Sequence, residues 1–181
     1  MKTYIITDTH YFHQRLIEWG DRPENFTELI IENCKSMINP EDTVIHLGDV
    51  IFGTEKEKRL TEIMNQLPGN WILIRGNHDE KPTSLYLRSG FKLVLESLVM
   101  DDILFSHVPV EKSKWPEDVV CNVHGHFHNN AHRTGEFPFY SGAPDYRLLA
   151  VEHTDLKPVL LEEFLGISFD AKRKRPTRNY Y

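Results

Sequence analysis

The 181-residue chain lacks the features that mark secreted, membrane-spanning or disordered proteins. It has only two cysteines, Cys34 and Cys121, which are too few for a disulfide framework. No uninterrupted apolar run exceeds four residues, so no transmembrane helix and no membrane partner are expected. Polar residues follow the first methionine too early for a signal peptide, and we therefore expect a cytoplasmic protein. Hydrophobic residues make up 40% and charged residues 27%, as in globular proteins.

No internal repeat, low-complexity stretch or flexible linker divides the chain. We therefore expect one domain over residues 1–168 and a basic C-terminal tail over residues 169–181. The last eleven residues contain five basic side chains and no acidic one, and without them 16 basic residues face 27 acidic ones, a net charge of −11. This negative charge over residues 1–170 argues against broad binding to nucleic acid phosphates. The basic tail keeps nucleic acid open as a less favoured partner.

Short apolar segments predict buried strands. They are continuous rather than alternating and are rich in isoleucine and valine, as in strands that are covered on both faces. The expected strands are residues 4–6, 44–47, 71–74, 91–100, 103–105, 119–123 and 148–151.

Two segments between these strands have the helical spacing of apolar residues. One begins at Asn25 and the other at Thr54, each followed three residues later by a glutamate that would complete a capping box. Pro68 and Gly69 would end the second helix. The alternation of strands and helices predicts an α/β fold with a parallel sheet. Shorter connections in the second half favour more antiparallel pairing there.

Polar side chains follow five of the expected strands, at the point where each strand ends. These side chains are Asp8 and His10, Asp49, Asn77 with His78 and Asp79, His107, and finally His126 and His128. In open α/β sheets, ligands bind beyond the carboxyl ends of the strands. We therefore expect the five loops to meet in one crevice.

Most of these side chains are potential metal ligands. They offer imidazole, carboxylate and amide groups without a thiolate, a set that suits Mn, Fe, Zn or Co better than Ca or Mg. The seven expected ligands are Asp8, His10, Asp49, Asn77, His107, His126 and His128. Seven ligands exceed the needs of one four-coordinate ion and fit two ions that share a carboxylate, an arrangement used in phosphoryl transfer. His78 remains for proton transfer, and Asp79 either orients that imidazole or caps a following helix.

In these blocks the sequence resembles the calcineurin-like metallophosphoesterase superfamily. That family's signature is D-x-H, GD, GNH(D/E), a lone histidine and GHxH. Here it reads Asp8-Thr9-His10, Gly48-Asp49, Gly76-Asn77-His78-Asp79, His107 and Gly125-His126-Phe127-His128. The resemblance covers residues 8–128, about two thirds of the chain. It implies a two-sheet α/β sandwich with helices outside, in four α/β/β/α layers.

Further segments are similar to the small stand-alone branch of this superfamily found in bacteria and phages. They are Phe12-His13, Asp21-Arg22-Pro23, Lys157-Pro158-Val159 and Leu161-Glu162-Glu163. Valine follows Asp49, where the Ser/Thr protein phosphatases have D-R-G, so a protein phosphatase of that type is not expected. The branch is defined by sequence and indicates no substrate.

The resemblance also implies roles for individual residues. One ion would be held by Asp8, His10, Asp49 and His128, and the other by Asp49, Asn77, His107 and His126. The cofactors would be two divalent ions, Mn first, with Fe, Zn, Co or Ni as alternatives. A bridging hydroxide would attack phosphorus, and His78 would protonate the leaving oxygen.

The activity implied is metal-dependent hydrolysis of a small phosphodiester or phosphomonoester. A nuclease or nucleic-acid end-processing enzyme is the alternative, and a non-enzymatic scaffold is a third hypothesis. His13 and Arg22 are candidate phosphate contacts, because a guanidinium binds phosphate through two hydrogen bonds. A surface salt bridge explains Arg22 almost as well.

Overall fold

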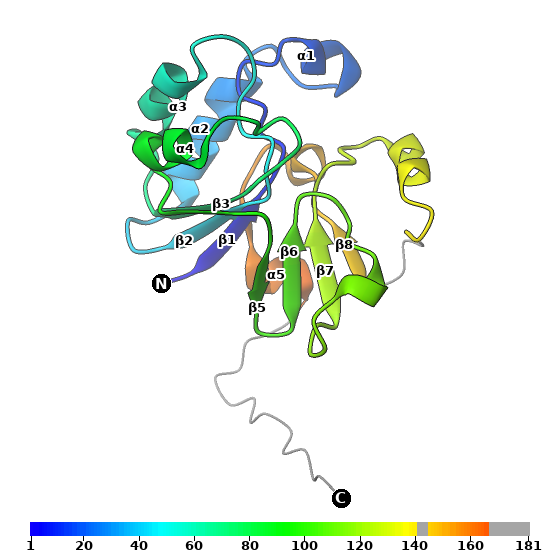
Figure 1. Ribbon diagram of the computed structural model, residues 1–181. Coiled ribbons are helices and arrows are strands. Elements are labelled where there is room, and N and C mark those ends of the chain that lie inside the picture. Colours follow the sequence, from blue (N-terminus) through cyan, green and yellow to red (C-terminus); the bar gives the residue numbers. More distant parts are fainter. Residues whose placement is uncertain (141–144, 167–181) are drawn as a thin grey trace, which may run out of the picture.

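The structure, a computed structural model, describes residues 1–140 and 145–166 and contains two β-sheets (Figure 1). The first sheet has the order β4-β3-β2-β1-β9, with β1 Thr3–Ile6, β2 Thr43–His46, β3 Asn70–Ile74, β4 Leu93–Leu95 and β9 Val159–Leu160. The second has the order β5-β6-β7-β8, with β5 Leu98–Met100, β6 Ile103–Ser106, β7 Cys121–His124 and β8 Tyr146–Leu148. The tail expected over residues 169–181 lies outside the described residues.

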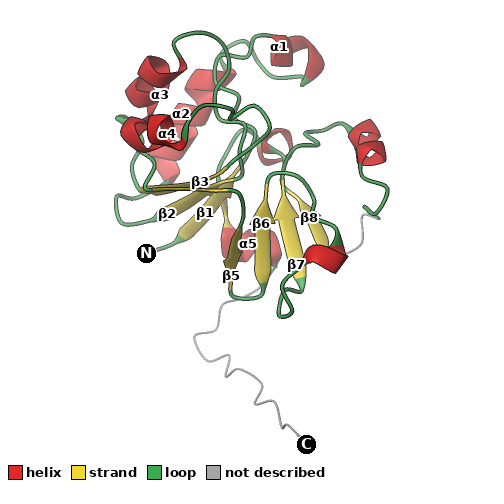
Figure 2. Cartoon of the chain, in the orientation of Figure 1, coloured by secondary structure: helices red, strands yellow, loops and turns green. Residues whose placement is uncertain are grey.

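Alternation along the strands of the first sheet gives the protein two cores. In β1, Tyr4 and Ile6 pack with the helices, whereas Ile5 packs with Phe105 and Val123 of the second sheet. The outer face of the first sheet is covered by α2 Phe26–Met37, α3 Lys56–Met64 and α4 Thr83–Ser89 (Figure 2). The fold is therefore a two-sheet α/β sandwich with helices outside.

Shorter segments complete the fold. They are α1 Arg15–Trp19, α5 Leu161–Leu165 and the 3₁₀ segments η1 Lys112–Lys114, η2 Ala131–Glu136 and η3 Val151–Thr154. In the part of the chain that the structure describes, no helix is long and apolar enough to cross a membrane.

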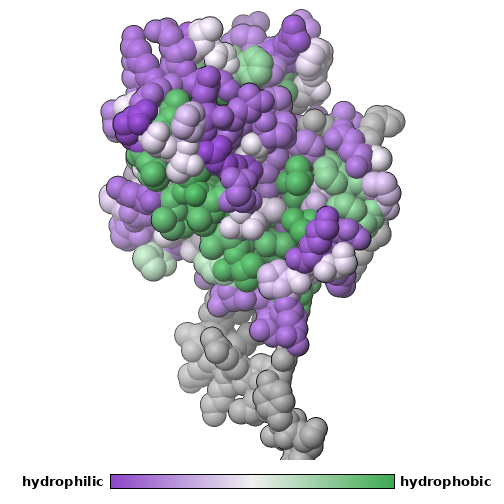
Figure 3. All heavy atoms as spheres, viewed as in Figure 1, coloured by the Kyte–Doolittle hydropathy of each residue, from purple (hydrophilic) through white to green (hydrophobic). Residues whose placement is uncertain are grey.

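Residues 91–100, expected as one strand, form two strands that belong to different sheets. β4 pairs in parallel with β3, and β5 pairs antiparallel with β6. Glu96 and Ser97 carry the chain from one sheet to the other, so a single apolar pattern spans two edge strands. Leu93 and Val99 are exposed at these edges, and Figure 3 shows hydrophobic residues gathered on this face of the molecule.

The second half of the chain is more parallel than expected. β6, β7 and β8 pair in parallel, and among the described strands the antiparallel pairs are β5 with β6 and β1 with β9. The reason lies in the connections, because residues 107–120 and 125–145 are long enough for the crossovers that parallel strands need.

Neither expected capping box forms a side-chain hydrogen bond within the described residues. α2 does begin directly after Asn25. α3 begins at Lys56, two residues beyond Thr54, because Glu55 takes a left-handed backbone conformation with φ 53°. This turn delays the start of the helix and removes Thr54 from the capping position.

Candidate metal centre

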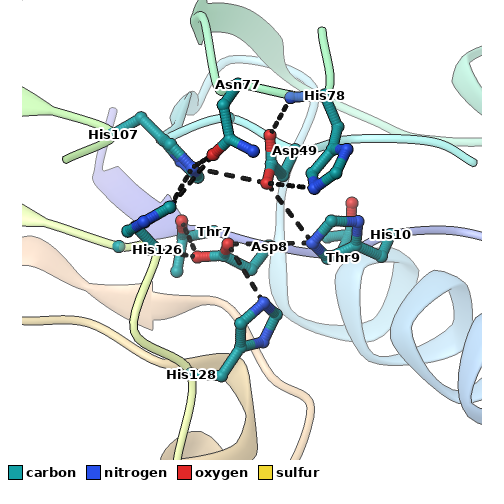
Figure 4. A network of polar contacts seen from close by, with 12 residues as sticks. Thr7, Asp8, Thr9, His10, Asp49, Asn77, His78, His107, His126 and His128 are labelled. Carbon is teal, nitrogen blue, oxygen red and sulfur yellow. Dashed lines mark hydrogen bonds and ion pairs between the residues drawn. The ribbon is translucent and has the colours of Figure 1, made fainter. Parts of the chain in front are cut away.

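The loops that follow β1, β2, β3, β6 and β7 meet at one end of the sandwich (Figure 4). Backbone hydrogen bonds tie them together. The Asp8 N–H donates to the Gly48 carbonyl oxygen at 2.9 Å, and the Gly125 N–H donates to the His107 carbonyl oxygen at 2.9 Å. The structure thereby brings all seven expected ligand side chains together, with His78 beside them.

Most of the ligand residues have a strained backbone. Positive φ angles occur at Asp8 (49°), His10 (43°), Asp49 (58°), His126 (73°) and His128 (52°). This region is uncommon for residues other than glycine, and such strain gathers at functional sites.

The glycines of the motifs allow carboxylates to pack directly against backbone. A Cβ on Gly76 would clash with Asp49 Oδ1, and a Cβ on Gly125 would clash with Asp8 Oδ2. The position of each carboxylate therefore depends on a neighbouring glycine.

Asp8, His10 and His128 form one potential ligand set, with one ligand atom of each within 4.8 Å of the others. His128 Nε2 lies 3.5 Å and His10 Nε2 lies 3.9 Å from Asp8 Oδ1. That oxygen is buried and has no hydrogen-bond partner among the described residues. A buried carboxylate oxygen without a partner is costly. Its position between two imidazole nitrogens fits a bound cation.

Asp8, Asp49 and His107 form a second potential set under the same 4.8 Å limit. Asp49 Oδ2 lies 3.3 Å from His107 Nε2 and 3.4 Å from His10 Nε2, so Asp49 of the second set also lies beside His10 of the first. Asn77 Oδ1 lies 3.0 Å both from His107 Nε2 and from His126 Nδ1. Oxygen and nitrogen donors therefore converge on two neighbouring points, with Asp49 between them.

Two of the imidazoles are oriented by acceptors behind them. His107 Nδ1 lies 2.7 Å from the Leu47 carbonyl oxygen, and His128 Nδ1 lies 2.9 Å from Glu152 Oε1. Both acceptors require the Nδ1 nitrogen to donate, which directs each Nε2 at the carboxylates and makes it the nitrogen that can bind a cation once its proton is lost. Metal-binding histidines are commonly held in this way.

Burial and charge shift the pKa values at the centre in different directions. Burial lowers the pKa of His10 to about 3, against the opposing effect of the Asp8 and Asp49 carboxylates. Burial also disfavours protonation of His107, but its hydrogen bond to Asp49 and the Asp8 charge raise its pKa to about 9. Burial raises the pKa of Asp8, but the nearby His128 and His107 more than offset this, so its pKa is lowered. The carboxylates therefore stabilise positive charge on His107, whereas the more strongly desolvated His10 stays neutral.

Glu152, which no motif marks, lies behind His128. Its side chain is 6% exposed, and its Oε1 accepts from His128 Nδ1 and from Arg22 Nη2, the latter at 2.6 Å. Arg22 also donates to the carbonyl oxygens of Asp8 at 2.7 Å and Thr9 at 2.8 Å. The expectation that Arg22 contacts phosphate is therefore corrected, because this buried guanidinium is bound to protein acceptors. Glu152 and Arg22 together link His128 to the loop that carries Asp8.

Asp79 accepts hydrogen bonds from backbone groups, and its predicted role in orienting His78 stays a prediction. Its Oδ2 accepts from the N–H groups of Asp49 at 2.7 Å and Gly76 at 2.9 Å, and its Oδ1 accepts from the Val50 N–H at 3.1 Å. Among the described contacts, this carboxylate joins the loops after β2 and β3 and does not reach the His78 imidazole. The next helix, α4, begins only at Thr83, so Asp79 does not cap it either.

His78 lies at the open side of the centre. Its side chain is 44% exposed, and its Nε2 lies 4.0 Å from Asp49 Oδ2. Its backbone N–H donates to Asp49 Oδ1 at 2.8 Å. His13 lies on the same side, with its ring 5.6 Å from the ring of His10 and 3.9 Å from that of Phe52. His13 is therefore placed near any molecule that approaches His78, whereas Arg22 lies behind the ligands.

Comparison with known proteins now assigns the family. The model of the calcineurin-like phosphoesterase family matches residues 1–172. The chain belongs to the calcineurin-like phosphoesterase family. An uncharacterised protein of Methanocaldococcus jannaschii is 30% identical over 167 residues, which cover 89% of this chain and 88% of that protein.

Solved structures also resemble this phosphoesterase. A protein of unknown function from Aquifex aeolicus matches with a TM-score of 0.69 and 25% identity, over 90% of this chain and 96% of that one. The nuclease MPE of Pseudomonas putida matches with a TM-score of 0.46 and 18% identity, over 70% and 61% of the two chains. The calcineurin-like family typically binds divalent metals, and this chain has side chains that fit such ions.

Proposed function

We propose that this calcineurin-like phosphoesterase hydrolyses a small phosphodiester or phosphomonoester with two divalent metal ions, manganese first among them. The observation that carries the proposal is the pair of ligand sets around Asp8 and Asp49, with the buried Asp8 Oδ1 left without a hydrogen-bond partner among the described residues. One ion would be held by Asp8, His10, Asp49 and His128, and the other by Asp49, Asn77, His107 and His126. Bound there, the ions would supply Lewis-acid stabilisation of charge on the phosphoryl oxygens.

His78 is the side chain placed to move a proton. The Asp8, His10 and Asp49 side chains are buried, whereas the His78 imidazole reaches the open side, where an ester would approach. We propose that its Nε2–H gives a proton to the leaving oxygen, since an alkoxide leaves more easily once it is protonated. The hydrogen bond from the His78 backbone N–H to Asp49 Oδ1 holds the backbone that carries this imidazole beside the candidate ligands.

Turnover of two aryl esters tests the proposal. The protein is stripped with a chelator and reloaded separately with Mn, Zn, Co or Mg, and bis-p-nitrophenyl phosphate is compared with p-nitrophenyl phosphate. We expect turnover only with metal. For an alkyl phosphate ester, whose alkoxide leaving group needs a proton, His78→Ala should lower kcat by about 10²- to 10⁴-fold, the range for loss of a general acid. The aryl esters should lose less, because p-nitrophenolate leaves without a proton. Substitution of the exposed His153 by alanine is the matched control and should leave the rate unchanged.

The metal content of each variant separates chemistry from ligand loss. His78→Ala should keep the same number of ions as the unmodified protein, because His78 is not among the proposed ligands. An unchanged rate of alkyl ester hydrolysis in His78→Ala would contradict its role. No turnover of either ester in a protein that holds two ions would point to the scaffold hypothesis instead.

A further inference from the structure

Phe52 is an exposed aromatic side chain beside the metal centre. It is 38% exposed, although Val50 and Ile51 before it are buried. Its N–H donates to the Tyr11 carbonyl oxygen at 3.1 Å, and Ile51 forms a β-bridge with Tyr11. The backbone that carries the ring is therefore held in place. A ring that is already positioned loses little conformational freedom when it binds a ligand.

Three side chains surround the exposed ring. The His13 ring lies 3.9 Å from the Phe52 ring and is tilted by 39°, and the His78 ring lies 6.3 Å away. Lys56 Nζ lies 5.9 Å from the centre of the Phe52 ring and donates to the His78 carbonyl oxygen at 3.3 Å. We call Phe52, His13 and Lys56 the aromatic shelf. The shelf adjoins His78, the residue proposed to protonate the leaving oxygen.

A hollow of about 650 Å³ begins at the shelf. It is lined by residues 53–58 together with Lys81 and Leu85, and Lys56 belongs to both hollow and shelf. Its lining contains three lysines and two glutamates. The carboxylate of Glu57, one of the two glutamates, is paired with Arg88, whose Nε lies 2.8 Å from Glu57 Oε1. The space beside the shelf is therefore open and weakly basic.

We propose that the aromatic shelf binds a planar aromatic ring in the leaving group of the phosphate ester, as in esters of nucleosides. The proposal rests on the proposed function, because His78 marks the leaving-group side. A nucleobase would stack on the Phe52 ring, and Lys56, whose Nζ lies over that ring at 5.9 Å from its centre, would add a cation to the same stack. Stacking on an aromatic side chain accepts every base, so the shelf selects a chemical class rather than one base.

Binding of three phosphate compounds to the metal-loaded full chain tests the shelf. Inorganic phosphate, ribose 5-phosphate and adenosine 5′-monophosphate share the phosphate, and the last two differ only in the base. Calorimetry should show the nucleotide binding at least about tenfold more tightly than ribose 5-phosphate, which corresponds to about 1.4 kcal/mol. Phe52→Ala should abolish this preference, and Phe52→Tyr should retain it.

The chain offers a matched control in Phe139, which is 37% exposed and packs against Tyr146 instead of against His13 and His78. Phe139→Ala should keep the preference for the nucleotide. Equal binding of the nucleotide and ribose 5-phosphate, with phosphate still bound, would overturn the shelf and leave the proposed function standing. A preference that survives in Phe52→Ala would also overturn it. If phosphate fails to bind the metal-loaded protein and neither aryl ester is turned over, the proposed function itself fails.

Discussion

At the scale of single residues, Glu152 decides how His128 faces the centre. Its carboxylate accepts the Nδ1 proton of His128, which leaves His128 Nε2 free to face Asp8. Arg22 neutralises Glu152 and holds the loop of Asp8 through two carbonyl oxygens. The three side chains form one buried unit behind the candidate ligands, and a substitution of any of them should change the affinity for metal.

Glu152→Gln should weaken metal binding by about 10- to 100-fold, the usual effect of losing a partner that orients a metal-binding histidine. Titration calorimetry with Mn²⁺ measures this change. The exposed Glu162, substituted by glutamine in the same way, should bind Mn²⁺ like the unmodified protein. Equal affinity in Glu152→Gln and Glu162→Gln would show that Glu152 does not support the centre.

The meeting of the candidate ligands could be predicted from the sequence, because each follows a strand and belongs to a short local motif. Glu152 could not be predicted in this way. It lies 24 residues from His128 and meets it only after η3 has packed against the loop that follows β7. Arg22 belongs to a recognisable segment, but its chemistry alone suggested phosphate binding, because its burial depends on the fold.

At the scale of elements, Asp79 joins the loops that follow β2 and β3. Its two oxygens accept from three backbone N–H groups, two of them in the loop that carries Asp49. The position of Asp49 between the two ligand sets therefore depends on Asp79, which lies 30 residues away.

Asp79→Asn should lower the free energy of unfolding of the metal-free protein by about 1–3 kcal/mol, because the amide group places a donor against a backbone N–H. Urea unfolding in the presence of chelator measures this loss, and the exposed neighbour Glu80, substituted by glutamine, is the control. A variant of full stability with a shifted pH–rate profile would instead support the role of Asp79 in orienting His78.

Elements with long apolar patterns were predictable, whereas short ones were not. The strands that carry the ligands and α2 follow from their apolar residues and their spacing. The segment that forms β4 and β5 has one continuous pattern, and its division depends on which sheet each half joins. α4 spans only Thr83–Ser89 and is fixed by packing of Leu85 and Tyr86 against the core.

At the scale of the whole molecule, the polar interior is sensitive to acid. His46 is buried at the end of β2, and its Nδ1 accepts from the Gly48 N–H at 3.1 Å. Its Nε2 lies 2.9 Å from Thr9 Oγ1. The Thr9 hydroxyl donates its proton to the Val50 carbonyl oxygen, so His46 Nε2 is the donor to Thr9. The ring is therefore neutral, and burial lowers the pKa of His46 to about 3.

The folded pKa of His46 lies below its unfolded value of about 6.5, so its contribution to stability is complete above pH 6.5 and is lost as pH falls. His46 alone changes the free energy of unfolding by up to about 1.4 kcal/mol per pH unit. The free energy of unfolding of the metal-free protein is measured with urea between pH 6.5 and 5. It should fall less steeply with pH in His46→Asn than in the exposed control His153→Asn. Identical slopes would contradict the assignment of a neutral buried His46.

The number of ions bound per chain tests the central claim most directly. Equilibrium dialysis against Mn²⁺, followed by elemental analysis, should give two ions per chain for the unmodified protein. His128→Ala and His107→Ala, which each remove a ligand of a different ion, should each give about one. A count of one or none in the unmodified protein, or two in both variants, would contradict the assignment of two ligand sets that meet at Asp49.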